Sequence, residues 1–147
     1  MSAWRRIALK LFPEHKRWIE NGQETFSIYS LWFELLPMAR EAHLSENKEL
    51  LGRIYKFGDW CWKQKRSWYM QNAVAVAFYE HLVDHEETRR AIPQWLTSTQ
   101  FRDFQDLFES RMSEADYEEL LENFDAINKT QFASARKKRV QTTKKAG

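Results

Sequence analysis

Residues 50–83, LLGRIYKFGDWCWKQKRSWYMQNAVAVAFYEHLV, decide how this chain folds. The stretch predicts two helices, at about 46–65 and 68–84, joined by the basic turn KQKRS. The second helix is apolar on nearly every side as far as Glu80 and His81, and such a helix is stable only when other elements surround it. We therefore expect these two helices to form the centre of the fold.

The composition predicts an all-α protein. The chain has four Gly and three Pro, which is few for a protein of many strands and turns. Leu, Glu, Lys, Arg and Ala, which favour helices, are plentiful. A length of 147 residues fits one domain with a buried core. We expect a single-domain irregular helical bundle, or an array of paired antiparallel helices, with about six to seven helices.

Local signals predict where several helices begin, end or approach one another. The candidate N-caps are Ser45, either Thr97 or Ser98, and Ser113. Pro37 should kink its helix or divide it in two, and residues 85–96 are expected to form a connector broken by Pro93. Gly58 would let a partner helix approach closely.

The net charge of +2 conceals an uneven distribution. Residues 129–147 contain seven basic residues and no acidic one, whereas residues 1–128 contain 16 basic and 21 acidic residues. The terminal segment also has little apolar surface to offset the entropy lost on ordering. The sequence therefore predicts an acidic helical domain over residues 1–128, followed by a disordered basic tail over residues 129–147.

Cysteine content and hydropathy indicate the compartment. Cys61 is the only cysteine, so no disulfide forms within the chain, and a reducing compartment suits it. The first residues lack the continuous apolar region of a secretory signal. No run approaches the roughly 20 apolar residues that a membrane span needs. We expect a cytoplasmic protein without a membrane-bound segment.

The residues that most resemble catalytic or metal sites have simpler interpretations. His81 and His85 lie four residues apart, a spacing that suits two metal ligands, but a polar helix end explains them equally well. Cys61 lies on an apolar stripe between Trp60 and Trp62, where a cysteine behaves as a small hydrophobe. A glycine-rich phosphate loop is missing from the sequence. We predict no catalytic residue, no metal site, no cofactor and no small-molecule ligand.

The abundance of aromatic residues favours a binding function instead. Seven Trp are too many for the core of so small a domain, and Trp and Tyr are enriched where proteins bind partners. An acidic domain would associate fastest with a basic partner, such as the working domain of a toxin. The predicted partner-binding residues are Asp59, Trp62, Glu86, Glu87 and Trp95.

A second group of polar residues is expected to be structural. If the two central helices form an antiparallel hairpin, positions whose numbers sum to roughly 133 lie level, because both helices rise equally per residue. Arg53 then lies opposite Glu80 and neutralises it, with Lys56 one turn away as the alternative donor, and Gly52 lies near His81. The alternative is an unrecognised enzyme in which Glu80, His81 and Asp59 line a pocket.

Four segments together resemble a known family: IYKFGDWCW at 54–62, NAVAVAFYEHL at 72–82, IPQWL at 92–96 and ESRMSEADYEEL at 109–120. The resemblance covers about residues 25–122 and is to small bacterial all-helical proteins of uncharacterised function, associated with toxin–immunity and defence gene neighbourhoods. It implies no catalytic residues. It favours a non-enzymatic, immunity-like protein that binds and occludes a partner. The alternative is a nucleic-acid-associated accessory protein that acts through its basic tail.

Overall fold

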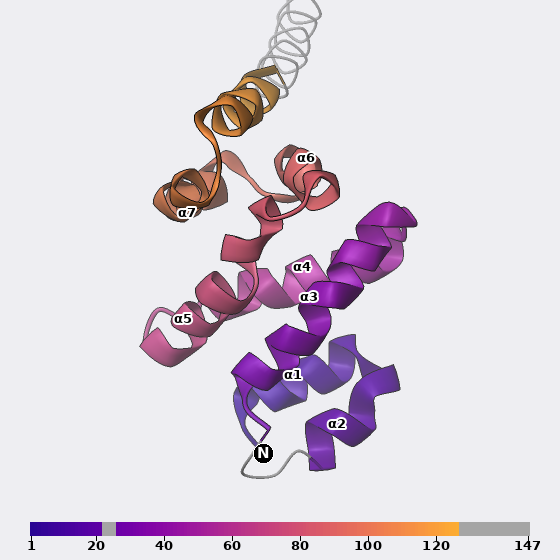
Figure 1. Ribbon diagram of the computed structural model, residues 1–147. Helices are drawn as coiled ribbons and strands as arrows, with labels where there is room; N and C mark the ends of the chain where they lie inside the picture. The colour runs from indigo at the N-terminus through magenta and orange to yellow at the C-terminus, as the bar shows by residue number, and fades with distance from the viewer. Residues whose placement is uncertain (22–25, 127–147) are drawn as a thin grey trace, which may run out of the picture. The chain divides into compact units, whose positions relative to one another are not determined.

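The computed structural model describes residues 1–21 and 26–126, which form helices connected by short turns (Figure 1). The predicted all-α class is confirmed, and these residues contain eight α-helices rather than six to seven. They group into two compact units, Met1–Ala91 and a second unit that begins at Ile92. One helical domain over residues 1–128 stays a prediction, and the predicted basic tail over 129–147 lies outside the described residues.

The first unit contains five α-helices and two 3-10 segments. In chain order they are α1 (Ala3–Leu11), η1 (Pro13–His15), α2 (Lys16–Asn21), α3 (Ile28–Leu44), α4 (Lys48–Trp62), α5 (Trp68–Ala77) and η2 (Tyr79–Val83). Helix α6 (Glu86–Trp95) begins in the first unit and ends in the second, which continues with α7 (Ser98–Arg111) and a helix over residues 114–126.

Short polar side chains begin several of these helices by accepting a hydrogen bond from the backbone N–H three residues on. The capping residues are Ser27, Asn47, Ser67 and Thr97. Of the two residues predicted for the last of these caps, Thr97 rather than Ser98 fills it, and the prediction that Ser45 caps the next helix is wrong. Ser45 instead ends α3, and Glu46 takes a left-handed backbone conformation with φ of 54° before Asn47 starts α4.

Two prolines lie inside helices. The sequence left open whether Pro37 divides its segment, and α3 runs through it as one helix with Pro37 exposed. The prediction that residues 85–96 form a connector broken by Pro93 is wrong, because they form α6. Pro93 lies in the last turn of that helix, where the missing N–H affects only one hydrogen bond. Thr88, which is 1% exposed, holds the start of α6 by donating to the Leu82 carbonyl at 2.6 Å.

The central pair of helices forms as predicted near its turn and departs from the prediction farther along. Gln71 Nε2 donates to the Trp62 carbonyl at 2.8 Å, a pair whose numbers fit the expected register. The second helix was expected to reach residue 84, but α5 ends at Ala77, where Phe78 leaves helical geometry with φ of −131° and ψ of −72°. Glu80 therefore belongs to η2, and the helical register does not extend to it.

Arg53 has a different structural role from the one predicted. Its Nη1 donates to the Leu11 carbonyl at 2.8 Å and to Glu14 Oε1 at 2.5 Å, and its Nη2 donates to Glu49 Oε2 at 3.1 Å. The predicted Arg53–Glu80 pair is therefore wrong. Arg53 joins α4 to the end of α1 and to η1, where its hydrogen bonds also satisfy a carbonyl left over at the helix end.

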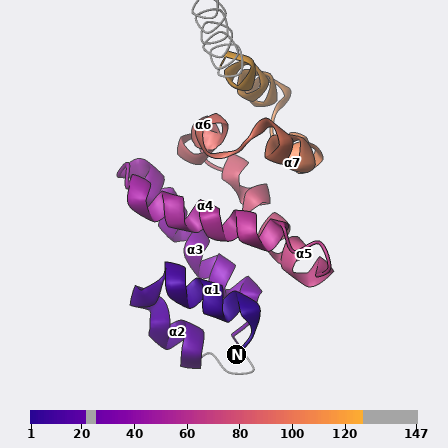
Figure 2. The ribbon, with the colours of Figure 1, turned by 180° about the vertical axis from the view of Figure 1, so that it is seen from behind.

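Trp32 lies at the centre of the first unit, fully buried on α3. Its ring stacks on Phe57 of α4 at a centroid distance of 5.1 Å and on Phe78, after α5, at 4.7 Å. Helix α3 lies in front of α4 in Figure 1 and behind it in Figure 2, so the two helices form separate layers with these rings between them. Gly58 lets Tyr79 enter the same core, as expected for a close approach at that position.

The second unit has its own aromatic contacts. The rings of Phe101 on α7 and Phe124 on the last helix lie 4.3 Å apart between centroids. Ser113 Oγ accepts a hydrogen bond from the Asp116 N–H at 3.2 Å, which is the predicted start of that helix. Helix α7 and the helix over residues 114–126 therefore pack against each other across a capped turn.

Replacing Gly58 with Ala tests the packing of the core. A Cβ at position 58 would lie 2.8 Å from Tyr79 Oη and 3.3 Å from Tyr79 Cζ, so the buried tyrosine must move. We expect Gly58→Ala to lower the free energy of unfolding by about 1–2 kcal/mol in urea denaturation. Gly52→Ala is the matched control on the same helix, since a Cβ there meets nothing within 4 Å, and it should raise stability by about 0.5–1 kcal/mol. Equal effects of the two substitutions would contradict this packing.

Candidate functional site

Three large aromatic side chains are exposed on two helices of the first unit that pack against each other. Trp68 is 74% exposed and Tyr69 is 46% exposed at the start of α5, and Phe33 is 59% exposed on α3. Single exposed apolar residues are common on protein surfaces, but adjacent ones mark interaction sites.

Tyr29 joins Phe33 to Tyr69, and Trp68 directly precedes Tyr69 in the first turn of α5. Its ring meets that of Tyr69 edge-to-face at a centroid distance of 5.2 Å, and its hydroxyl accepts a hydrogen bond from Asn72 Nδ2 at 2.7 Å. Phe33 follows Tyr29 by four residues, so the two side chains are neighbours on the surface of α3. We call Tyr29, Phe33, Trp68 and Tyr69 the aromatic patch.

The turn before α5 holds part of this patch in a fixed position. Gln64 Nε2 donates to the Trp60 carbonyl at 2.8 Å, and Ser67 Oγ accepts from the Met70 N–H at 3.2 Å. Met70 itself is buried, which anchors the first turn of α5. Trp68 lies in this turn, so little backbone entropy would be lost when a partner covers it.

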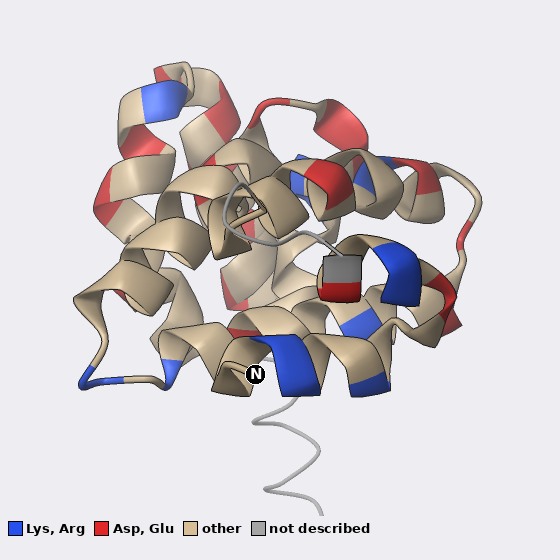
Figure 3. Cartoon of the chain, turned by 90° about the horizontal axis from the view of Figure 1, so that it is seen from below, with Lys and Arg blue, Asp and Glu red and all other residues tan. Residues whose placement is uncertain are grey.

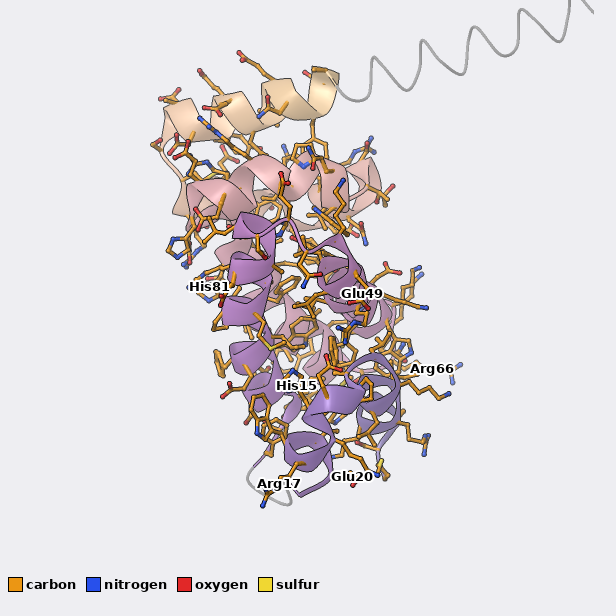
Figure 4. The ribbon with its side chains drawn as sticks, turned by 90° about the vertical axis from the view of Figure 1, so that its right-hand side faces the viewer. His15, Arg17, Glu20, Glu49, Arg66 and His81 are labelled. Atoms are coloured by element: carbon orange, nitrogen blue, oxygen red, sulfur yellow. The ribbon has the colours of Figure 1, made fainter. Side chains whose placement is uncertain are left out.

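The charge beside the α5 part of the aromatic patch is positive. Residues 60–79 contain three basic residues and no acidic one. Lys63 Nζ lies 2.7 Å from Asp59 Oδ2, so its charge is neutralised locally. Lys65 and Arg66 are exposed and form no salt bridge with any residue in the described part of the chain. Arg66 extends away from the ribbon (Figure 4).

The acidic charge of the chain lies elsewhere. Residues 92–126 contain nine acidic and two basic residues, whereas residues 1–91 contain 12 acidic and 14 basic ones. The helix that begins at the marked N-terminus, α1, carries Lys and Arg but no Asp or Glu (Figure 3). In the last helix, exposed carboxylates recur on one face at residues 114, 118, 122 and 125. The excess of acidic over basic residues therefore lies in residues 92–126, and the aromatic patch lies in the first unit.

The predicted partner-binding residues lie on α4 and α6, outside the aromatic patch. Asp59 and Trp62 are half-buried and one turn apart on α4. Glu86 and Glu87 lie in the first turn of α6, where Glu86 Oε1 pairs with an arginine of the next turn at 2.8 Å. Trp95 is half-buried at the end of α6, within the second unit. A partner role for these five residues stays a prediction.

Sequence reasoning missed Phe33, Trp68 and Tyr69. The only available signal was the position of Trp68 and Tyr69 directly after the polar turn, since side chains in the first turn of a helix are often exposed. Phe33 carried no such signal, because the apolar residues around it made the whole segment resemble a buried face.

The residues predicted for the alternative enzyme pocket lie on two elements, Asp59 on α4 and Glu80 and His81 on η2. His81 Nδ1 lies 2.7 Å from Asp84 Oδ2 in a pair at the end of η2, and Asp59 pairs with Lys63. Glu80 is half-buried in η2. Among residues 1–21 and 26–126, no group of three or more His, Cys, Asp or Glu side chains is arranged to hold a metal ion.

Cys61 is buried, as its position on the apolar stripe predicted. Burial raises the pKa of its thiol to about 12, and the indole N–H of Trp32 only partly opposes this shift. The thiol is therefore protonated at neutral pH, whereas the thiolate is the reactive form. This arrangement suits packing rather than nucleophilic chemistry.

A polar pair made of the half-buried His43 and the buried Tyr55 joins the end of α3 to α4. His43 Nε2 and Tyr55 Oη lie 2.9 Å apart, and their rings meet edge-to-face at 5.8 Å. Burial lowers the pKa of His43, although the nearby Glu87 carboxylate opposes that shift, and burial raises the pKa of Tyr55. Both side chains are therefore neutral near pH 7, and the hydrogen bond satisfies polar atoms that would be costly to bury alone.

Comparison with known proteins gives one match. Residues 6–100 match the family described as "Domain of unknown function (DUF7674)". This match covers the first unit from α1 onward and ends at the start of α7, so the aromatic patch lies inside it and the acidic helix over residues 114–126 lies outside it. No curated protein and no solved structure matches the chain. None of the helices in the described ranges is long and apolar enough to cross a membrane.

The half-buried His43 predicts how stability depends on pH. Its folded pKa lies below the ordinary value of 6.5, so the unfolded chain takes up the proton first as the pH falls. The contribution of the neutral His43 to the free energy of unfolding should therefore be fully present above pH 6.5. It should be lost as the pH falls through the folded pKa. Urea denaturation at pH 7 and pH 5 should show a smaller loss on acidification for His43→Gln than for the original chain. The same loss in both proteins would contradict the burial of a neutral His43.

Proposed function

We propose that this chain, which belongs to the DUF7674 family, is a non-enzymatic protein-binding module that occludes a partner in the manner of a bacterial immunity protein. The observation that carries the proposal is the aromatic patch on α3 and α5. Trp and Tyr dominate the residues that supply binding energy in protein interfaces. Occlusion needs only a rigid surface of this kind and no reactive group.

The size of the patch is sufficient for a specific anchor. An aromatic side chain buries about 150–250 Å² when it is fully covered, and each 100 Å² of apolar surface removed from water contributes about 2.5 kcal/mol. Covering Phe33, Trp68 and Tyr69 would therefore supply several kcal/mol, on the order of the entropic cost of association. The fixed turn before α5 lowers that cost further.

The acidic helices add an electrostatic contribution to the proposal. Nine carboxylates against two basic residues in 92–126 create a negative potential, which speeds encounters with a basic partner such as a toxin domain. This attraction acts over several ångströms and needs no fixed contact. Anchoring by the aromatic patch and attraction by the acidic helices are therefore separable in experiments.

Substitution of the patch tests the proposed function. We expect Phe33→Ser, Trp68→Ser and Tyr69→Ser together to abolish capture of the partner, because hot-spot aromatics often contribute about 2 kcal/mol or more each. The measurement is quantitative co-purification mass spectrometry of the tagged chain from its native host, followed by calorimetry with the partner so identified. Binding of the partner should be weakened by about 100-fold or more.

Leu44→Ser is the matched control, because Leu44 is 68% exposed at the end of α3 but does not belong to the aromatic patch. The control should capture the same partner in the same amount as the original chain. A triple variant that keeps its helical circular dichroism and its full set of partners would overturn the proposal.

A further inference from the structure

We infer that the partner segment covering the aromatic patch is acidic: an exposed protein segment that carries Asp or Glu beside an apolar side chain. This inference rests on the proposed function and gives the chemistry of the partner at that site. The aromatic patch would then prefer an acidic segment, whereas the acidic helices in residues 92–126 would attract basic charge.

Two cations, Lys65 and Arg66, lie next to the aromatic patch in the sequence. Lys65 and Arg66 directly precede the cap of α5, so they lie within one helical turn of Trp68 and Tyr69 along the chain. Their backbone is fixed, because the Lys65 N–H donates to the Lys63 carbonyl at 2.9 Å and the Ser67 N–H donates to the Gln64 carbonyl at 2.9 Å. The positive charge therefore forms a constant edge of the aromatic patch.

The charges of Lys65 and Arg66 are available to a binding partner. Lys63 is paired with Asp59, but Lys65 and Arg66 have no acidic partner within residues 1–21 and 26–126. Residues 60–79 supply no carboxylate of their own. A guanidinium can bind a carboxylate through two parallel hydrogen bonds, and partial burial under a partner strengthens such a bond. An acidic side chain on the partner is the complement that this edge lacks.

The charges around the aromatic patch favour an acidic protein segment over a nucleic acid or an anionic membrane. Single-strand nucleic acids bind along grooves with many cations, and their affinity grows with the number of phosphates neutralised. Lys65 and Arg66 alone give a small contribution of this kind. Glu34, exposed directly after Phe33, would also face the continuous negative charge of a phosphate backbone or an anionic membrane. A protein segment places its carboxylate at one edge only and avoids this repulsion.

The aromatic patch and the acidic helices together constrain the charge distribution of the whole partner. The patch selects a local acidic surface, whereas the acidic helices attract overall basic charge. A partner that uses both features must therefore carry an acidic apolar segment on an otherwise basic domain. Such an uneven charge distribution distinguishes it from a uniformly basic nucleic-acid-binding protein.

The test uses the full chain labelled with 5-fluorotryptophan, in which seven Trp give separate fluorine resonances. Trp68→Phe identifies the Trp68 signal. The probe is a short synthetic peptide of Glu, Leu and Trp, and its counterpart has Lys in place of every Glu. The acidic peptide should shift the Trp68 signal in a saturable way at low salt, and the basic peptide should leave it unchanged.

Charge reversal provides the specific control. Lys65→Glu with Arg66→Glu should weaken binding of the acidic peptide about tenfold or more, because each lost charge-assisted contact contributes about 1 kcal/mol. Lys48→Glu with Lys56→Glu makes the same change in net charge on exposed positions of α4 and should have little effect. Equal weakening by both double variants would show attraction by net charge alone and would overturn the inference.

Results with other ligands and at different protein concentrations also test the inferred acidic partner segment. No shift of the Trp68 signal with the acidic peptide, or a larger shift with oligothymidylate or phosphatidylglycerol vesicles, would overturn the inference. A shift that depends on protein concentration alone would assign the patch to a second copy of the chain. Retention of the native partner by the triple patch variant refutes the proposed function itself, whereas a failure of the peptides alone refutes only the acidic partner segment.

Discussion

The packing around Trp32 is the constraint on which the first unit depends. The indole lies between Phe57 and Phe78, and Tyr79 completes the core only because Gly58 has no side chain at the point of contact. This arrangement requires the chain to leave helical geometry after Ala77, so that η2 can turn the Tyr79 ring toward α4. The early end of α5 is therefore a consequence of core packing.

The same packing creates the aromatic patch. Successive residues of an α-helix are rotated by about 100° around its axis, so burying Trp32 turns Phe33 toward solvent. The contact between Tyr29 and Tyr69 then continues this exposed face of α3 onto α5. Arg53 holds α1 and η1 against another part of α4. The apolar surface is thus a fixed product of the fold, which is the property a preorganised binding site needs.

The acidic excess and the exposed aromatic residues lie in different parts of this chain. The excess of acidic over basic residues lies in residues 92–126, while residues 1–91, which carry the aromatic patch, have a small excess of basic residues. The family match covers the patch but ends at residue 100, before the nine acidic residues of the stretch 92–126. Binding through the patch would therefore belong to the family domain, and electrostatic attraction to the acidic helices would be an addition in this chain.

Local patterns in the sequence predicted much of the fold and little of the site. The all-α class, the cap at Thr97, the close approach at Gly58 and the register near Gln71 each follow from a few neighbouring residues. The Arg53–Glu80 pair failed because it assumed one continuous helix, whereas a long-range contact of Tyr79 ends that helix. The exposed aromatics were missed for a similar reason: periodicity cannot show which of several apolar faces other helices will cover.

Amide hydrogen exchange of the full chain, with and without its native partner, tests the central claim most directly. The account predicts that the partner adds protection in residues 64–72 and on α3 near Phe33, and leaves the exchange of η2 unchanged because its burial precedes binding. Added protection confined to residues 98–126, with no change in the turn before α5, would contradict the claim that the aromatic patch is the binding anchor.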